Sequence, residues 1–206
     1  MNNARFIVFE GLDGSGKTTQ LKLLLGRMTE EGIPVVTTLE PSDDNIPGLL
    51  ARAVVKKSLS LESDTLALLF AADRYQHTVK FIIPYLHDGF TVLCDRYYFS
   101  NFAYQGGDIP LETLIHYNER CMALCRPDAV IFLDTPPEEC ARRLRENRHE
   151  KPELFEYLEY MKRTRQHYIA AFDALRDNEN IFVVNSNNRT EEHISNEIWN
   201  IYQNIG

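Results

Sequence analysis

The sequence feature that most restricts the fold is a glycine-rich stretch near the N-terminus, GLDGSGKT at 11–18. It follows the apolar run FIVF and precedes a leucine-rich segment. The spacing fits GxxxxGK followed by Ser or Thr, between a predicted strand and a predicted helix, and a phosphate-binding loop requires this context. The stretch therefore predicts that the chain holds the phosphates of a nucleotide.

Each residue type in this stretch has a physical role in holding phosphates. The glycines permit backbone conformations that a Cβ excludes, so that successive N–H groups turn toward an anion. Lys17 supplies a mobile charge for the β- and γ-phosphates, and the Thr18 hydroxyl is placed to coordinate Mg²⁺. The predicted ATP-binding residues of the loop are Gly11, Gly14, Ser15, Gly16, Lys17, Thr18 and Thr19.

Composition limits the partners and the setting. The 206 residues are 44% hydrophobic and 25% charged, which fits one globular domain with a sizeable core. A net charge of -8 argues against a nucleic-acid backbone as partner but allows a mononucleotide. No signal peptide and no apolar run near eighteen residues is evident, so we expect no membrane association. The cysteines form no CxxC pair, so we expect buried thiols in a reduced, cytoplasmic setting, and the scattered histidines predict no metal site held by the protein alone.

Short β-branched or aromatic runs alternate with helical patterns along the chain. Their near-continuous apolarity suits parallel strands buried on both faces. Strands are predicted at 5–9, 34–38, 90–94, 129–133 and 181–184, and helices at 17–31, 46–57, 64–87, 111–124, 137–146, 153–176 and 191–202, the last capped by Thr190. The alternation predicts an α/β fold: a doubly wound, mostly parallel five-stranded sheet with helices on both faces and ligands beyond the carboxyl ends of the strands. No repeat or long linker appears, so 1–206 is predicted to be a single domain.

Charged residues follow three of the predicted strands. Asp13 follows the first, Glu40 and Pro41 follow the second, and Asp95 with Arg96 follows the third. An aspartate at the end of a buried strand beside a phosphate loop can hold Mg²⁺, while a neighbouring arginine can donate two parallel hydrogen bonds to a phosphate. A surface ion pair is the alternative for this dipeptide. Two phosphate sites on one sheet favour transfer between nucleotides over simple hydrolysis.

Four segments together carry a resemblance to a known family. GLDGSGKTTQ, LLFAADRYQH at 68–77, DRYYFSNFAYQG at 95–106 and RPDAVIFLD at 126–134 resemble thymidylate kinases, in that order and at roughly that spacing. The likeness covers most of the chain, and DRY followed by Ser and AYQG is its specific part. It implies a phosphate-loop nucleoside monophosphate kinase that transfers the γ-phosphate of ATP to thymidine monophosphate, uses Mg²⁺ and forms a homodimer.

The resemblance also implies roles for individual residues. Asp13 matches the acidic loop residue that meets the sugar 3′-hydroxyl of the acceptor, and Arg96 matches the arginine on the acceptor phosphate. Phe70 falls where a ring stacks on thymine and Arg74 where an arginine bonds the base, although a helical Phe is more often core. The remaining predicted substrate residues are Glu40, Pro41, Ser100, Asn101, Tyr104 and Gln105. A turn or cap is the alternative role for the polar ones.

The chain departs from the family pattern at the second-strand motif and in the lid. Residues 39–43, LEPSD, lack the arginine that bacterial members commonly carry there, so one expected phosphate contact is missing. The segment at about 142–156 is arginine-rich like the family's mobile lid, but Glu153 and Leu154 replace its usual aspartate and arginine. By position Arg143 fits the adenine-stacking arginine, and Arg145 or Arg148 is predicted to reach the transferring phosphoryl. A solvated helix face is the alternative.

The predicted mechanism assigns most of the chemistry to charge and alignment. A loose transition state needs in-line geometry and charge stabilisation, while lid closure excludes water. The predicted catalytic residues are Lys17, Asp13, Asp95, Arg145 and Arg148, with Thr18 and Asp95 on the metal. Two alternatives stay open: a deoxynucleoside kinase, and a catalytically weakened nucleotide-binding regulatory protein, which the missing arginine and the altered lid allow.

Overall fold

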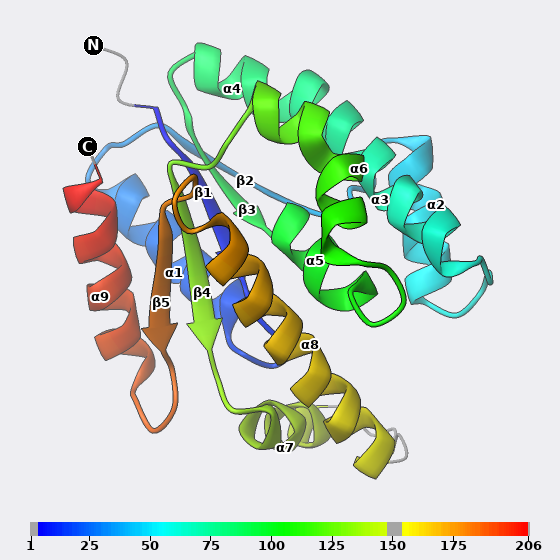
Figure 1. The fold of residues 1–206 in the computed structure, drawn as a ribbon. Coiled ribbons are helices and arrows are strands. Elements are labelled where there is room, and N and C mark those ends of the chain that lie inside the picture. The colour runs from blue at the N-terminus through cyan, green and yellow to red at the C-terminus, as the bar shows by residue number, and fades with distance from the viewer. Residues whose placement is uncertain (1–3, 148–153, 206) are drawn as a thin grey trace.

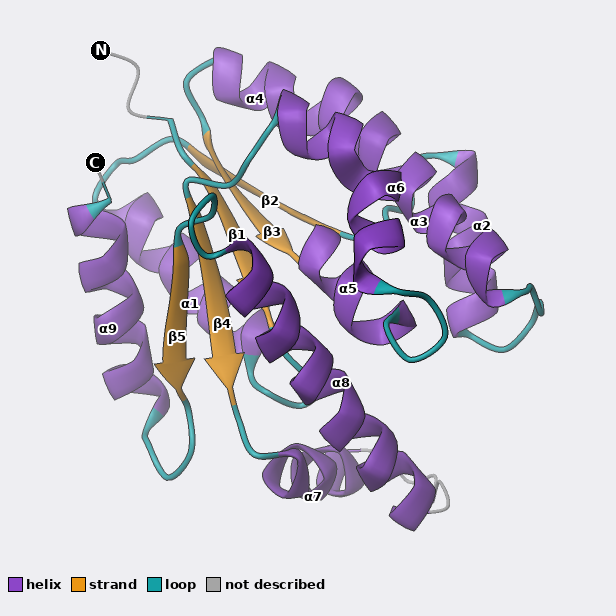
Figure 2. Cartoon of the chain, viewed as in Figure 1, coloured by secondary structure: helices purple, strands orange, loops and turns teal. Residues whose placement is uncertain are grey.

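A parallel β-sheet forms the centre of the molecule in the computed structural model, which describes residues 4–147 and 154–205. Its strands are β1 (Phe6–Glu10), β2 (Val35–Leu39), β3 (Thr91–Asp95), β4 (Ala129–Asp134) and β5 (Ile181–Asn185). Within the described residues the strand order is β2-β3-β1-β4-β5, and every neighbouring pair is parallel (Figure 2). Phe9 of β1 lies beside Asp95 of β3 and Ile131 of β4. The carboxyl ends of the central strands therefore meet at one edge.

Helices cover both faces of this sheet. They are α1 (Lys17–Glu30), α2 (Ile46–Val55), α3 (Ser63–His77), α4 (Ile83–His87), α5 (Tyr98–Gln105), α6 (Leu111–Leu124), α7 (Pro137–Asn147), α8 (Leu154–Leu175) and α9 (Glu191–Asn204), with a π-helical turn at Thr78–Ile82 between α3 and α4. Figure 1 shows α1 and α9 on one side of the strands, with α5, α6 and α8 on the other. None of the described helices combines the length and apolarity needed to cross a membrane.

The alternation of side chains along the strands explains this two-sided packing. Ile7 and Phe9 of β1 point into the core formed with α1 and α9, whereas Phe6 and Val8 point into the core formed with α5, α6 and α8. All four are essentially inaccessible to solvent. Full burial of such a side chain contributes about 1.5–3 kcal/mol each. A strand that is apolar at every position is therefore stable only between two helical layers.

The structure confirms the predicted fold class, the strands and most helices, with ends that differ by one or two residues. The single helix predicted at 64–87 is instead divided into α3, the π-helical turn and α4. The predicted cap is also confirmed, because the Thr190 side chain accepts a hydrogen bond from the His193 amide. Helix α5 was not predicted from the sequence. Its sequence, YFSNFAYQ, is rich in aromatic residues with modest helix propensity, and its first turn is closed by the carboxylate of Glu10, a residue of β1. The residues of α5 and their immediate neighbours in the sequence therefore do not reveal this helix.

Candidate active site

The phosphate loop joins the carboxyl end of β1 to the first turn of α1. Gly11, Gly14 and Gly16 have φ of 145°, 82° and 99°, values that residues with a Cβ rarely adopt. Space is also lacking at two of them, since a Cβ would lie 2.9 Å from the Leu133 carbonyl oxygen at Gly11 and 2.7 Å from the Cys140 carbonyl oxygen at Gly14. The predicted glycine requirement therefore follows from both conformation and packing.

Lys17 lies folded back across this loop. Its Nζ donates to the carbonyl oxygens of Gly11 and Leu12, each at 3.0 Å. Burial lowers the pKa of Lys17 to about 8, the Arg96 guanidinium acts in the same direction, and Asp95 opposes the shift. The ammonium group is thus poorly compensated by its surroundings, so a phosphate placed in the loop would be a better partner for it than two neutral carbonyls.

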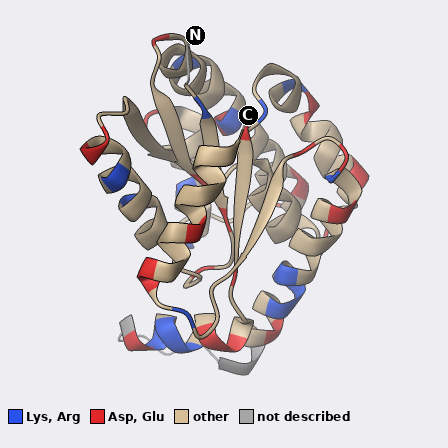
Figure 3. Ribbon diagram, turned by 90° about the vertical axis from the view of Figure 1, so that its left-hand side faces the viewer, with Lys and Arg blue, Asp and Glu red and all other residues tan. Residues whose placement is uncertain are grey.

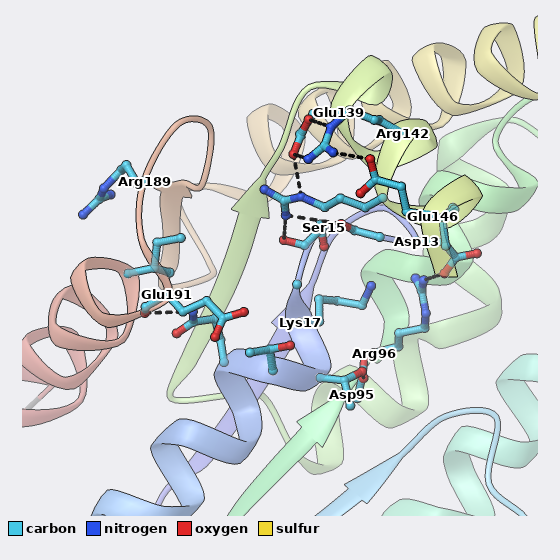
Figure 4. A pocket seen from close by; sticks show the side chains of 18 of the residues that line it. Asp13, Ser15, Lys17, Asp95, Arg96, Glu139, Arg142, Glu146, Arg189 and Glu191 are labelled. Atoms are coloured by element: carbon cyan, nitrogen blue, oxygen red, sulfur yellow. Dashed lines mark hydrogen bonds and ion pairs between the residues drawn. The ribbon is translucent and has the colours of Figure 1, made fainter. Parts of the chain in front are cut away.

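A cavity of about 710 Å³ opens around the loop, within the size range of small-ligand sites. Figure 4 shows Asp95 and Arg96 on one side of Lys17, with Arg189 and Glu191 on the other. Predicted site residues among its lining are Asp13, Gly14, Ser15, Gly16, Lys17, Thr18, Thr19, Glu40, Asp95, Arg96 and Arg143. This position beyond the carboxyl ends of the strands is where the fold class predicts a ligand.

Asp95 and Thr18 form a pair of oxygen donors beside the loop. The Thr18 hydroxyl donates to Asp95 Oδ2 at 3.0 Å. Asp95 Oδ1 is buried and has no hydrogen-bond partner among the described residues. A buried carboxylate oxygen without a partner is costly unless a ligand satisfies it, and carboxylate and hydroxyl oxygens are donors that Mg²⁺ prefers. The residues present therefore fit the predicted metal.

Arg96 gathers several of the predicted acceptor residues around one guanidinium group. Its Nη2 donates to Asp13 Oδ1 at 2.5 Å and to the Tyr104 hydroxyl at 3.1 Å, and its Nη1 donates to Ser100 Oγ at 2.9 Å. The Tyr168 hydroxyl, which the sequence analysis did not predict, lies 3.3 Å from Nη1. Arg96 also has a φ of 75°, which is uncommon for a residue with a side chain. Its placement is thus determined by many neighbours at once.

The predicted base-contacting arginine is held differently. Arg74 on α3 is buried, and its Nε donates to Glu40 Oε2 at 2.8 Å. Its Nη atoms donate to Asn118 Oδ1 at 2.5 Å and to the Tyr97 carbonyl at 3.1 Å. The other oxygen of Glu40 lies 3.1 Å from His77 Nδ1. Arg74 therefore ties α3 to α6 and to the end of β2, and its contact with a base stays a prediction.

Six other predicted substrate residues do not line the cavity as the described residues shape it: Pro41, Phe70, Ser100, Asn101, Tyr104 and Gln105. Phe70 is half-buried on α3, and the Asn101 side chain is buried and donates to Gln105 Oε1 at 3.0 Å. Their roles toward a thymine base stay predictions. Ser100 and Tyr104 nevertheless reach the acceptor side through their contacts with Arg96.

The arginines of α7 lie over the phosphate loop. Arg142 pairs with Glu139 at 2.7 Å and with Glu146 at 2.5 Å. Arg143 pairs with Glu139 at 2.8 Å, and its Nη1 donates to the carbonyls of Gly14 and Ser15 at 3.4 Å. These hydrogen bonds from both arginines lower the pKa of Glu139 to about 2. Figure 3 shows that basic and acidic residues lie close together on α7.

The two arginines predicted to reach the phosphoryl group fall at the end of α7. Arg145 is exposed, and no described residue forms an ion pair with it. Arg148 and the rest of 148–153 lie outside the described residues. The predicted lid is therefore described only in its α7 part and at the start of α8.

Several residues that line the cavity were not predicted from the sequence. The wall opposite Arg96 is formed by the turn between β5 and α9, where Arg189 pairs with Glu197 at 2.6 Å. Gln20 of α1 donates to the Glu191 carbonyl at 3.1 Å and so fixes this turn beside the loop. No motif marks the turn, and the only available signal was its position after a predicted parallel strand.

Comparison with known proteins agrees with the geometry. A family model described as thymidylate kinase matches residues 9–198. A probable thymidylate kinase of Pyrococcus horikoshii is 40% identical over 169 residues, 80% of each chain. A probable thymidylate kinase of Thermococcus gammatolerans is 36% identical over 195 residues, 91% of this chain and 90% of the relative. A thymidylate kinase of Symbiobacterium thermophilum is 42% identical over 136 residues, 65% of this chain and 64% of the relative. With the phosphate loop, the Asp95–Arg96 pair and most of the chain inside the matched range, this chain belongs to the thymidylate kinase family.

Proposed function

We propose that this protein transfers the γ-phosphate of ATP to thymidine monophosphate and so forms thymidine diphosphate. The observation that carries the proposal is the pairing of two cationic sites across one cavity. Lys17 and the loop amides lie at the end of β1, and Arg96 follows the adjacent strand β3. Membership of the thymidylate kinase family supports the choice of both substrates.

The chemistry follows from these positions. An oxygen of the acceptor phosphate attacks the γ-phosphorus, the bond from that phosphorus to the β–γ bridging oxygen breaks, and ADP leaves with the electron pair. The attacking oxygen is already anionic at neutral pH, so no carboxylate base is needed. Thr18 and Asp95 would hold Mg²⁺, which would supply charge neutralisation on the phosphates. Lys17 binds the donor phosphates, Arg96 orients the acceptor phosphate, and Asp13 accepts from the acceptor sugar.

The test is an ADP-release assay with ATP, Mg²⁺ and a panel of nucleoside monophosphates, together with thymidine. Thymidine monophosphate is expected to give the fastest turnover, and chelation of Mg²⁺ is expected to stop it. Turnover of thymidine without turnover of its monophosphate would favour a deoxynucleoside kinase. Tight nucleotide binding without ADP release would favour a regulatory protein.

The same proposal includes one kinase domain over 1–206, with 142–156 as a lid. Contact between Arg143 and the loop carbonyls supports the lid, because it places α7 beside the phosphate loop. We place the protein in the cytoplasm. All four cysteines are free thiols, as a reducing compartment leaves them.

We further propose a homodimer formed through α2 and α3. These packed helices expose large apolar side chains, among them Ile46 at 73%, Leu49 at 52%, Val55 at 62% and Leu68 at 48% of their surface. Figure 1 shows α2 on the outer side of the molecule. Apolar surface gathered in this way marks an interface more often than a free surface.

Charge placed on this face is expected to separate the dimer. A Leu49→Asp/Leu68→Asp variant should elute at the monomer mass in size-exclusion chromatography with light scattering, because each carboxylate would be buried without a partner. Ile169→Asp on α8, a similarly exposed apolar position, is the control and should leave the mass unchanged. A dimer that survives the double substitution, or a monomeric wild type, would contradict the proposed interface.

Replacing Arg96 with lysine tests the acceptor site. A point charge does not reproduce the planar two-pronged contact with a phosphate, so Arg96→Lys should raise the KM for thymidine monophosphate by about 10–100-fold, the equivalent of one charge-assisted hydrogen bond. The KM for ATP should change little. Initial-rate kinetics with each substrate varied in turn provide the measurement, and equal losses for both substrates would point to a structural ion pair instead.

A further inference from the structure

Glu10, the last residue of β1, carries a carboxylate that is fully buried directly before the phosphate loop. Its Oε1 accepts from the amides of Tyr97 at 2.9 Å and Ser100 at 3.1 Å. Its Oε2 accepts from Ser100 Oγ at 2.6 Å and from the Tyr168 hydroxyl at 2.8 Å. Burial raises the pKa of Glu10, while the Arg96 guanidinium and these hydrogen bonds oppose the shift. Nothing in the transfer chemistry uses this carboxylate directly.

The directions of these hydrogen bonds lead from Glu10 to Arg96. A hydroxyl has one proton, and when Ser100 and Tyr168 both donate to Glu10 their oxygens remain as acceptors. Arg96 Nη1 donates to both of those oxygens, at 2.9 Å and 3.3 Å. A guanidinium group only donates, so the arrangement is satisfied when Glu10 is ionised and both hydroxyls turn toward it. The carboxylate therefore sets the orientation of the acceptors that hold one edge of Arg96.

Glu10 also fixes the helix that carries these contacts. The amides of Tyr97 and Ser100 lie at the start of α5, where few backbone N–H groups find partners within the helix; the Ser100 amide has one other acceptor, the Tyr97 carbonyl at 3.2 Å. Helix α5 supplies two of the hydroxyls that contact Arg96, from Ser100 and Tyr104. The Arg96 amide itself donates to the carbonyl of Phe9, the residue before Glu10. The end of β1 thus holds both the main chain and, through α5 and α8, the side chain of Arg96.

We propose that Glu10 is a positioning residue for the acceptor phosphate, acting on Arg96 through the hydroxyls of Ser100 and Tyr168. The inference rests on the proposed function, in which Arg96 receives that phosphate. Without this support the guanidinium is free to turn fully toward Asp13, which already accepts from its Nη2. Misplacement of a binding group by about 1 Å can cost 10²-fold in rate, so indirect support of this kind matters.

The test is Glu10→Gln, which keeps the size of the side chain and removes its charge. A carboxamide NH₂ does not accept the hydroxyl protons of Ser100 and Tyr168. The two hydroxyls lie 2.9 Å apart, so one can donate to the other, and the second proton is then left to turn toward Arg96. The KM for thymidine monophosphate is expected to rise about 10–100-fold, by analogy with the loss of a residue that orients a metal-binding side chain. The KM for ATP is expected to stay near that of the wild type. Initial-rate kinetics give both values, and thermal unfolding checks the fold.

Glu179→Gln is the matched control. Glu179 is also a buried carboxylate whose pKa burial raises, and it accepts from the hydroxyl of Tyr98 on the same helix α5 at 2.7 Å. None of its hydrogen-bond or ion-pair partners among the described residues contacts Arg96. This variant shares the structural cost of removing a buried carboxylate, and it should leave the KM for thymidine monophosphate unchanged.

Tyr168→Phe provides a second, independent variant should Glu10→Gln fold poorly. It removes one of the two hydroxyls between Glu10 and Arg96, so it should raise the same KM. Because both substitutions act on one network, their combined effect should be smaller than the product of the single effects.

The outcomes separate the two proposals. A wild type that does not phosphorylate thymidine monophosphate would overturn the proposed function and this inference with it. An active wild type, with KM values for thymidine monophosphate unchanged in Glu10→Gln and in Tyr168→Phe, would overturn the positioning role alone. Equal increases for both substrates, matched by Glu179→Gln, would assign Glu10 a structural role only.

Discussion

Removal of the lid arginine that we propose to reach the transferring phosphoryl group is expected to lower kcat about 10³–10⁵-fold, with nucleotide affinity nearly intact. The affected variant should be Arg145→Ala or Arg148→Ala. Within the phosphate loop of this chain, Gly14 leaves no room for a further charged side chain, because a Cβ there would lie 2.7 Å from the Cys140 carbonyl oxygen. We therefore propose that further positive charge comes from outside the loop.

The ion pairs on α7 indicate which arginines are available to reach the phosphoryl group. Arg142 is held by Glu139 and Glu146, and Arg143 by Glu139. Arg145 is exposed, and no described residue forms an ion pair with it that would have to break when the lid closes. Arg148 lies outside the described residues and is tested on the strength of its sequence position.

Single-turnover measurements of phosphoryl transfer at saturating substrates test this lid hypothesis directly. Arg163→Ala, which removes an exposed arginine from α8, controls for the change in net charge and should keep wild-type kcat. If both single variants and the double variant transfer phosphate at the wild-type rate, the lid hypothesis is wrong and the segment is a solvated helix.

Lys17→Ala is expected to lower kcat about 10²–10³-fold, the cost of losing one preorganised group that stabilises charge in the transition state. The Lys17 ammonium is buried, with only the Gly11 and Leu12 carbonyl oxygens within hydrogen-bond distance among the described residues. Its lowered pKa of about 8 reflects that poor compensation. A γ-phosphate that gains charge as it leaves ATP is a stronger partner, so the lysine should bind the transition state more tightly than the ground state.

Steady-state kinetics distinguish this role from simple ATP binding. Lys22→Ala, which removes an exposed lysine from the same helix α1, is the control and should behave as the wild type. An unchanged kcat with a raised KM for ATP in Lys17→Ala would mean that the lysine binds ground state and transition state equally.

Local patterns in the sequence determined the fold class and one half of the site. Strands that are apolar at every position predicted a parallel sheet between two helical layers, and the structure confirms both. The phosphate loop was recognisable because its glycines, its lysine and its place between a strand and a helix are all set within a few residues. The cap at Thr190 was predicted for the same reason. Each of these features depends on neighbours in the chain.

Only the tertiary structure decided how the acceptor side is supported. Glu10 closes the first turn of α5 across 90 positions of sequence and meets Tyr168 across 158. The pairing of Arg74 with Glu40 in the interior was not predicted, and neither was helix α5. Burial of a charge is tolerated only where distant donors converge on it. Such convergence is a property of packed elements, so neither spacing nor composition along the chain reveals it.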